Sequence, residues 1–543
     1  MSNAVVTVPD PQNEPIRDYA PGSPERETLK AKLDELLKEE IEIPLVIGGE
    51  EVRTGDTAPC VCPHDHGHRL GLFHQAGERE VARAVEAAAA AWTQWSETSW
   101  EDRAAVFLKA ADLLAGPYRD LLNASSMLDQ SKTVYQAEID VACELIDFWR
   151  FNPAFMRELY RMQPRSAPGT WNQVEYRPLE GFVFAVTPFN FASISGNLPT
   201  APALMGNTVL WKPASSVVYV CYRLMRLLEE AGLPPGVINF IPGKGRSVGD
   251  PVLASGAFAG LHFTGSTDTF QGMWRTIAGN LPRYRSYPRI VGETGGKDFV
   301  LAHPSADVPA VVTALTRGAF EYQGQKCSAA SRAYVPKSLW PAVREGLEEQ
   351  VGRIRMGAPT DFRSFMAAVI DEPAFDKITG YIAHAESSPE HEVILGGGSD
   401  KSEGYFIEPT VVVSTDPRSK LMVEEIFGPV LTVFVYPDGE LERTVELVDT
   451  ASPYALTGAV FAQERPAIAE LARRLRHAAG NFYVNDKPTG AVVSQQPFGG
   501  GRASGTNDKA GSIFNLTRWV SQRAIKESFV PPTDFVYPHM DEK

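Results

Sequence analysis

The sequence predicts an α/β protein with two doubly wound sheets, one in each of two large domains, in a chain of 543 residues. Short apolar runs alternate with segments of helical length, which is typical of parallel strands that crossover helices bury on both faces. This alternation begins at Gly181 and starts again near Lys297. A chain of this length also exceeds one ordinary domain.

The composition excludes several classes of protein. Hydrophobic residues make up 43% and charged residues 22%, which fits a globular chain and not a disordered or fibrous one. No apolar run approaches the roughly 20 residues that cross a bilayer, so we expect no membrane partner. A net charge of -15 disfavours nucleic acid as a partner. We therefore expect a small-molecule substrate.

The number of cysteines indicates the redox compartment. There are five, an odd number spread over a long chain, which argues against a disulfide framework. We expect a reducing compartment: the cytoplasm, or the mitochondrial matrix if the source is eukaryotic and a transit peptide has been removed.

Helices dominate the N-terminal part after an acidic, proline-containing arm of about thirty residues. Ser23 followed by Pro24 is a helix N-cap with proline at the first helical position. Helices are also expected over 78–95, from the Ser99 cap to Gly116, and over about 118–160.

Apolar runs at 181–188, 207–213, 236–243 and 260–266 predict the first parallel sheet. Ligands of such sheets bind beyond the carboxyl ends of the strands, which favours a nucleotide cofactor here. The glycines at 243–249 and 292–297 match neither a dinucleotide fingerprint nor a P-loop in full.

A second group of strand-like runs, at 297–303, 331–337, 404–413, 428–436 and 456–463, predicts the second sheet. Two further segments, 171–178 and 518–529, alternate polar and apolar residues like half-buried strands. Strands that project from a domain suit pairing with another subunit, so we expect a homo-oligomer, either a dimer or an assembly of dimers.

Five potential metal ligands lie close together but do not fit a common metal site. They alternate along one stretch and would share one side of a strand, which surrounds an ion poorly. We expect an exposed, histidine-rich turn and no metal, with metal binding as the less favoured alternative. The residues are Cys60, Cys62, His64, His66 and His68.

Cys327 is the candidate nucleophile. It lies among small and polar residues in YQGQKCSAASR (322–332), beside Lys326. A structural cysteine usually sits in an apolar run, whereas a nucleophile needs room for substrate and a positive environment that favours the thiolate. A lone cysteine does not establish catalysis.

Six motifs in order resemble the aldehyde dehydrogenase superfamily, over about residues 45 to 530. The interval of 34 residues from Glu293 to Cys327 (327 − 293) equals the family's usual spacing of base and nucleophile. The motifs are TPFNF (187–191), WKPAS (211–215), FTGS (263–266), GETGGK (292–297), GQKCS (324–328) and EEIFGPV (424–430).

The resemblance implies the catalytic roles. Cys327 would attack the aldehyde and form a thioester after hydride transfer, the side chain of Asn190 would stabilise the oxyanion, and Glu293 would activate water. The ordinary alternatives are a turn residue for Asn190 and a capping or ion-paired carboxylate for Glu293.

The resemblance also implies a Rossmann-type NAD-binding domain. Many relatives have glutamate at the position of Ser215 and glycine at that of Phe270, so the choice of NAD over NADP rests on the closer subfamily. Surface charge is the alternative for Lys212 and Glu425. The implied cofactor residues are Thr187, Lys212, Ser215, Gly265, Ser266, Glu425 and Phe427.

The stretch from Thr489 to Gly511 is similar to the subfamily that oxidises L-glutamate γ-semialdehyde, from 1-pyrroline-5-carboxylate, to L-glutamate in proline catabolism. That similarity implies a site for the substrate's carboxylate and methylene chain. An ordinary turn and core packing are the alternatives. The implied residues are Phe191, Lys326, Ser328, Gly490, Ala491 and Phe498.

Two other functions stay open: another NAD(P)-dependent semialdehyde dehydrogenase and a non-catalytic scaffold on this fold. A CoA-acylating enzyme is less favoured because Glu293 offers a base for hydrolysis. The expected divisions are an arm and helical part (1–160), flap strands (161–178), the NAD-binding core (179–295), the catalytic domain (296–480), a substrate-anchor loop (481–509) and a C-terminal flap strand with tail (510–543).

Overall fold

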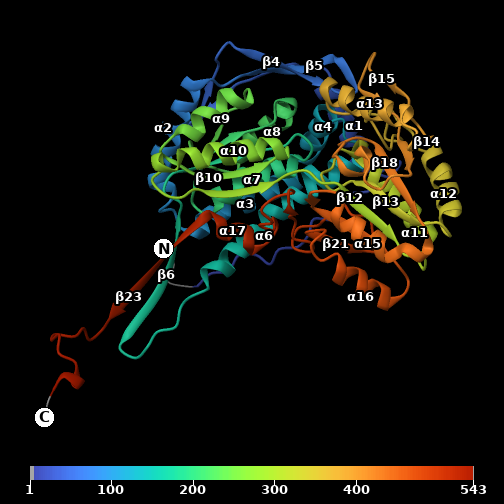
Figure 1. The fold of residues 1–543 in the computed structure, drawn as a ribbon. Coiled ribbons are helices and arrows are strands. Elements are labelled where there is room, and N and C mark those ends of the chain that lie inside the picture. The colour runs from blue at the N-terminus through green and yellow to red at the C-terminus, as the bar shows by residue number, and fades with distance from the viewer. Residues whose placement is uncertain (1–4, 542–543) are drawn as a thin grey trace.

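The computed structural model describes residues 5–541 and contains two seven-stranded α/β sheets with a projecting two-stranded flap. The first sheet, in blue and green, and the second, in yellow to orange, lie side by side (Figure 1). This arrangement confirms the predicted fold class.

The first sheet has the order β11-β10-β7-β8-β9-β2-β3. The five strands β7 to β11 are parallel to one another, whereas β2 pairs antiparallel with both β9 and β3. The strands are β2 (Leu45–Ile47), β3 (Glu50–Val52), β7 (Phe182–Val186), β8 (Thr208–Lys212), β9 (Ile238–Phe240), β10 (Phe258–Thr264) and β11 (Arg289–Glu293).

Successive side chains of the buried strands serve two cores, because a strand alternates its faces. On β7, Phe182 and Phe184 pack with α2, α9 and α10, while Val183 and Ala185 pack with the N-terminal helices. One face is covered by α2 (Glu78–Trp95), α9 (Gly245–Ala254) and α10 (Thr267–Asn280). The other face is covered by α3 (Trp100–Ala115), α4 (Arg119–Asp129), α6 (Leu145–Tyr160), α7 (Ala192–Leu204) and α8 (Val218–Glu230).

Local signals place several N-terminal helices where the sequence predicts them. The side chain of Ser23 caps α1 (Pro24–Leu36), and that of Ser99 caps α3. The helical region 118–160 is interrupted after α4 and contains α5 (Val134–Ala137) and a π-helical segment, Glu138–Glu144. π-Helical turns often occur at functional sites.

The hairpin of β4 (Thr57–Cys62) and β5 (Asp65–His74), joined by β1 (Ile41–Ile43), corrects one prediction. The histidine-rich turn is not fully exposed: Cys60, Cys62 and His64 are buried. The His64 Nδ1 lies 2.7 Å from the Ser131 hydroxyl oxygen, and burial lowers the pKa of His64 to about 4. Within residues 5–541, no group of three metal-ligating side chains is arranged to hold an ion.

The second sheet has the order β14-β17-β18-β13-β12-β20-β21, parallel except for β14. It extends past residue 480, because β21 pairs with β20. Its strands are β12 (Asp298–Ala302), β13 (Ala330–Pro336), β14 (His391–Leu395), β17 (Thr410–Ser414), β18 (Val430–Tyr436), β20 (Thr457–Phe461) and β21 (Asn481–Val484).

Helices cover both faces of this sheet. Helices α11 (Val308–Phe320) and α12 (Trp340–Gly352) pack on one face, and α15 (Leu441–Thr450) and α16 (Arg465–Arg474) on the other. Helix α13 (Glu372–Ser387) adds a smaller core. Short elements complete the domain: β15 (Ser399–Asp400), β16 (Phe406–Ile407), α14 (Lys420–Val423), β19 (Tyr454–Ala455) and β22 (Gly501–Arg502). Helix α17 (Ile513–Leu516) returns to the first domain, where it packs with α6.

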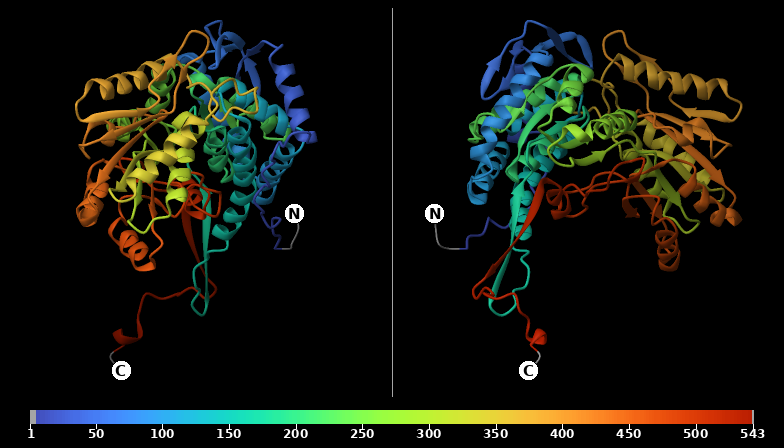
Figure 2. Two further views of the ribbon diagram at one scale, coloured as in Figure 1. Left: turned by 90° about the vertical axis from the view of Figure 1, so that its right-hand side faces the viewer. Right: turned by 60° about the vertical axis from the view of Figure 1, so that its left-hand side comes forward.

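The flap consists of β6 (Thr170–Pro178) and β23 (Val520–Ser528), paired antiparallel along their full length. It projects away from both sheets, and the C-terminal residues continue beyond it (Figures 1 and 2). Among the described helices, none is long and apolar enough to span a membrane.

Candidate active site

Two cavities meet at Cys327, which is half-buried and lines both. One, of about 500 Å³, is lined by the segment around Gly490 and is called the Gly490 cavity. The other, of about 420 Å³, lies at the carboxyl ends of the first sheet's strands and is called the Lys212 cavity. A reactive group at such a junction can touch ligands in both cavities at once.

The loop that carries Cys327 is held in an unusual backbone conformation. Tyr322 and Gln323 have φ values of 51° and 56°, in the left-handed region that non-glycine residues rarely adopt. Gly324 has φ 66°, and a Cβ there would lie 2.2 Å from the carbonyl oxygen of Gly428, so only glycine fits.

Two glutamine side chains fix this loop to the rest of the protein. The Gln323 amide donates to the carbonyls of Ser131 (3.2 Å) and Ala368 (2.7 Å). The Gln325 side-chain oxygen accepts a hydrogen bond from the Ile370 N–H at 2.9 Å. These contacts explain why the polar residues of YQGQKC are buried, and they make the position of Cys327 rigid.

The electrostatic setting of Cys327 differs from the prediction. Burial, and then the carboxylates of Asp298, Glu293 and Glu425, raise the pKa of its thiol well above the usual value. The Lys326 ammonium does not offset this effect, because it forms a buried ion pair with Glu321 at 3.0 Å. The free protein therefore holds a neutral thiol, which must lose its proton before it can attack.

Asn190 and Glu293 are both near Cys327 but have different surroundings. Asn190 lines the Lys212 cavity, and its amide donates to the carbonyl of Gln325 at 3.1 Å. Glu293 lines neither cavity, lies against Gly499, and has one carboxyl oxygen without a hydrogen-bond partner in the described chain. Burial raises the pKa of Glu293, so its carboxylate is a stronger base than an exposed one but must be ionised before it can take up a proton.

The structure brings six of the seven predicted cofactor residues into the Lys212 cavity. Ser215 is the exception: it is exposed at the start of a 3-10 turn, and its hydroxyl lies 3.4 Å from the carbonyl of Gly243. Its neighbour Ala214 lines the cavity instead. The six are Thr187, Lys212, Gly265, Ser266, Glu425 and Phe427.

This cavity has the features that a dinucleotide needs. Ser266 caps the N-terminus of α10, where free N–H groups and the helix dipole attract a pyrophosphate. The Lys212 ammonium, whose pKa burial lowers to about 8, donates to the carbonyl of Pro213 at 3.0 Å. The side chain of Phe270 does not line this cavity and belongs to the hydrophobic core, where its ring packs on that of Phe263 with ring centres 5.4 Å apart.

The carboxylate of Glu425 is held in place by the backbone of Gly295 and Gly296. One carboxylate oxygen accepts from the N–H of Gly296 at 2.8 Å. A Cβ at Gly295 would lie 2.3 Å from the other oxygen, so this glycine leaves room for the carboxylate. The residues present thus fit a nicotinamide dinucleotide, and the carboxylate of Glu425 lies on the wall of the cavity that would hold it.

All six predicted substrate residues line the Gly490 cavity. The Ser328 hydroxyl donates to the Thr489 hydroxyl at 2.8 Å. Gly490 has φ 99°, which only glycine adopts readily, and the Lys487 ammonium donates to the carbonyl of Thr489 at 3.2 Å. Phe498 is fixed by two hydrogen bonds between its backbone and that of Ala510 (2.9 and 2.8 Å).

This cavity also has an acidic wall, which the sequence did not predict. Glu144, at the end of the π-helical segment, lines it and accepts from the Ser193 hydroxyl at 2.9 Å. Burial, and then Asp140, raise the pKa of Glu144 to about 8. Asp140 is itself ion-paired with Lys132, whose ammonium lies 4.7 Å from the Phe191 ring centre. No local motif marks these residues.

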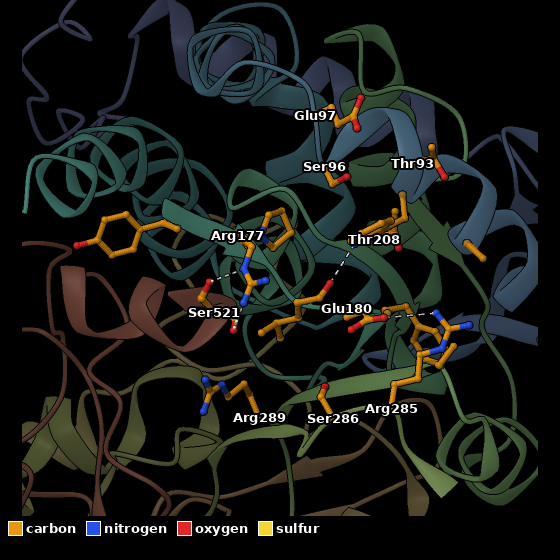
Figure 3. Close-up of a pocket in the computed structure, with 18 of the residues that line it drawn as sticks. Thr93, Ser96, Glu97, Arg177, Glu180, Thr208, Arg285, Ser286, Arg289 and Ser521 are labelled. Carbon is orange, nitrogen blue, oxygen red and sulfur yellow. Dashed lines mark hydrogen bonds and ion pairs between the residues drawn. The ribbon is translucent and has the colours of Figure 1, made fainter. Parts of the chain in front are cut away.

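A larger cavity, of about 830 Å³, lies elsewhere, at the base of the flap (Figure 3). Charged side chains surround it, including Arg177, Glu180 and Arg285, and Arg177 contacts the Ser521 hydroxyl at 3.5 Å. None of the predicted catalytic, cofactor or substrate residues lines it.

Two α/β sheets and a cavity that fits a dinucleotide, at the carboxyl ends of the first sheet's strands, are typical of a two-domain, NAD-dependent oxidoreductase. The chain belongs to the aldehyde dehydrogenase family, whose pattern matches residues 51–525.

Several relatives and solved structures resemble nearly the whole chain. A Dictyostelium discoideum protein named "Delta-1-pyrroline-5-carboxylate dehydrogenase, mitochondrial" is 53% identical over 99% of this chain and 97% of its own. A Homo sapiens protein of the same name is 50% identical over 97% of this chain and 94% of its own. The crystal structure of the Mycobacterium tuberculosis Delta-pyrroline-5-carboxylate dehydrogenase bound with NAD has a TM-score of 0.96 and 55% identity, covering 99% of this chain and 100% of that one.

Proposed function

We propose that the protein oxidises L-glutamate γ-semialdehyde, the open form of 1-pyrroline-5-carboxylate, to L-glutamate with NAD, as the second step of proline catabolism. The position of Cys327 between the Gly490 and Lys212 cavities is the observation that carries this proposal. The names of the full-length relatives support the same reaction.

The chemistry of the aldehyde end follows from three side chains. The Cys327 thiol first loses its proton to solvent, and the thiolate then attacks the aldehyde carbon. The amide of Asn190, with the N–H of Cys327, would stabilise the resulting oxyanion. NAD, bound in the Lys212 cavity, would accept the hydride that converts this thiohemiacetal to a thioester. Glu293 then takes a proton from the water that hydrolyses the thioester, after its side chain turns from Gly499 toward Cys327.

The other end of the substrate carries a carboxylate and an ammonium group. The N–H groups of Gly490 and Ala491 and the Ser328 hydroxyl would bind the carboxylate. Phe191 and Phe498 would pack on the methylene chain. We add Glu144 as the partner of the ammonium group, because it is a carboxylate on the wall of the same cavity.

We propose that residues 179–295 and 296–480 form the cores of the NAD-binding and catalytic domains. Strands β7 to β11 lie in the first range and β12 to β20 in the second. We also propose that the protein works in the cytoplasm or, in a eukaryote, in the mitochondrial matrix, since the two relatives above are named mitochondrial.

The flap would join two copies into a dimer or an assembly of dimers. It exposes large apolar side chains: Trp171 is 53% and Ile525 37% exposed, and Phe529, the residue after β23, is 59% exposed. Exposed apolar groups on a projecting ribbon are typical of interfaces. Light scattering of a Trp171→Asp, Ile525→Asp double variant should give the monomer mass; an unchanged oligomer would contradict this role of the flap.

An NADH-formation assay without CoA tests the function. Glutamate semialdehyde should be preferred over succinic semialdehyde and propanal, and Ser328→Ala should reduce that preference. Cys327→Ala should abolish activity. Lack of preference would favour another semialdehyde dehydrogenase, and the absence of activity on every aldehyde would favour a scaffold.

A further inference from the structure

The N-terminal arm forms part of the substrate cavity. Residues 5–22 have no helix or strand, yet three side chains of this arm, Asn13, Glu14 and Ile16, line the Gly490 cavity. These residues are far in sequence from Cys327 and from the Gly490 segment, and no motif includes them. The arm therefore contributes a wall that neither α/β domain supplies.

Asn13 connects two other walls of that cavity. Its side-chain N–H groups donate to a carboxylate oxygen of Asp147 on α6 (2.8 Å) and to the carbonyl of Val493 (3.1 Å). Its side-chain oxygen accepts from the Gln495 amide at 3.0 Å. The segment with Val493 and Gln495 directly follows Gly490 and Ala491, so Asn13 ties this segment to α6.

The arm itself is held by buried charges. Glu14 pairs with Arg119 and, at 2.7 Å, with Arg150. The Tyr19 hydroxyl donates to Glu138 at 2.8 Å, and Arg119 pairs with the same carboxylate. Arg119 and Glu138 are fully buried, so separating them from their partners would leave unpaired charges in the interior. The arm is therefore a fixed wall.

We propose that Asn13 is a positioning residue that fixes the Gly490–Ala491 segment and sets the length of substrate that the Gly490 cavity accepts. This inference rests on the proposed function, because that segment matters only if it binds the substrate's carboxylate. Asn13 touches the segment's continuation through Val493 and Gln495 and does not touch Cys327. Its loss should weaken substrate binding and leave the chemical step unchanged.

The test compares Asn13→Ala and Asn13→Asp with wild type and with Gln12→Ala, a matched control because Gln12 is the exposed neighbour on the same arm. The aspartate keeps the volume of Asn13, cannot donate to Asp147 or Val493 when it is ionised, and places a second carboxyl beside that of Asp147. For both Asn13 variants, we expect KM for glutamate semialdehyde to rise about five- to tenfold, with kcat within twofold. Alanine loses all three hydrogen bonds of Asn13 and aspartate loses the two that Asn13 donates, and part of that loss weakens the Gly490–Ala491 segment. KM for propanal should not change.

Two further measurements separate positioning from general damage. Hydrogen exchange of the peptide that covers residues 487–496 should become faster in the Asn13 variants and not in Gln12→Ala. Relative activity on the homologous semialdehyde with one more methylene should rise in Asn13→Ala, because the wall is smaller.

Equal losses on propanal, a fall in kcat alone, or unchanged KM and exchange would each overturn the proposal. If wild type shows no preference for glutamate semialdehyde, the proposed function fails instead, and the exchange experiment still reports whether Asn13 fixes the segment.

Discussion

Replacing Glu144 by glutamine should weaken binding of glutamate semialdehyde specifically. Glutamine keeps the shape of the side chain and an oxygen that can accept from Ser193, which donates to Glu144 at 2.9 Å. The negative charge is lost. A hydrogen bond between charged partners is worth about 1.5–3 kcal/mol, so kcat/KM should fall by about ten- to 150-fold.

The pH dependence provides a second measure of the same contact. Burial raises the pKa of Glu144 to about 8, so the carboxyl is neutral in the free protein below that pH and must ionise to pair with an ammonium group. At about pH 6.5, 1.5 units lower, ionisation costs about 2 kcal/mol, or about thirtyfold in binding. The advantage of wild type over Glu144→Gln in kcat/KM should therefore grow as pH rises toward 8.

The assay is NADH formation at several pH values, with both proteins measured on the same substrate solutions, since ring opening of the substrate also depends on pH. Propanal, which has no ammonium group, serves as the control substrate. An equal loss on propanal would show general damage to the site. A ratio of wild type to variant that is constant with pH would refute the assignment of the charge to Glu144.

Three other substitutions test separate parts of the site. Glu293→Gln should form NADH at the normal rate in the first turnover and at least tenfold more slowly in later turnovers, because the thioester forms but is not hydrolysed. Loss of the first turnover in rapid-mixing experiments would contradict the role of Glu293 as the base. Gly295→Ala should raise KM for NAD about tenfold or more, because its Cβ would lie 2.3 Å from a carboxylate oxygen of Glu425. Titration of NAD binding measures the effect, and an unchanged affinity would exclude Glu425 as a residue that contacts NAD. Gly324→Ala should lower the melting temperature, because its Cβ would lie 2.2 Å from the Gly428 carbonyl oxygen at a φ of 66°; an unchanged melting temperature would show that the loop adapts.

The predicted elements share local signals that do not depend on distant contacts. Ser99 caps α3 and Gly116 ends it, both as expected from the residues alone. Strands such as β7 and β10 were predicted because nearly every position in them is apolar or small, which is typical of strands buried on both faces. Helix α13 and strand β14 were missed, because their half-exposed segments lack such a uniform pattern.

The missed site residues depend on contacts between distant parts of the chain. Asn13 meets Val493 across 480 positions, and no local pattern can place an arm against a loop so far away. The sequence predicted that the ammonium of Lys326 would favour the Cys327 thiolate. In the structure this ammonium forms an ion pair with Glu321, five residues earlier in the chain. His64 was expected in an exposed, histidine-rich turn, but the hairpin packs it against Ser131.

The reactivity of Cys327 can be tested without any aldehyde. Burial and the neighbouring carboxylates raise the pKa of its thiol above the usual value of about 9, so iodoacetamide should modify it slowly at neutral pH and faster only above about pH 9. Glu425→Gln should move this profile to lower pH, because it removes one of the negative charges that disfavour the thiolate. Mass spectrometry of the peptide with Cys327 separates its modification from that of the four buried cysteines. A profile centred near neutral pH would mean that a positive group acts on the free thiol, and the ion pair of Lys326 with Glu321 would then have to open in solution.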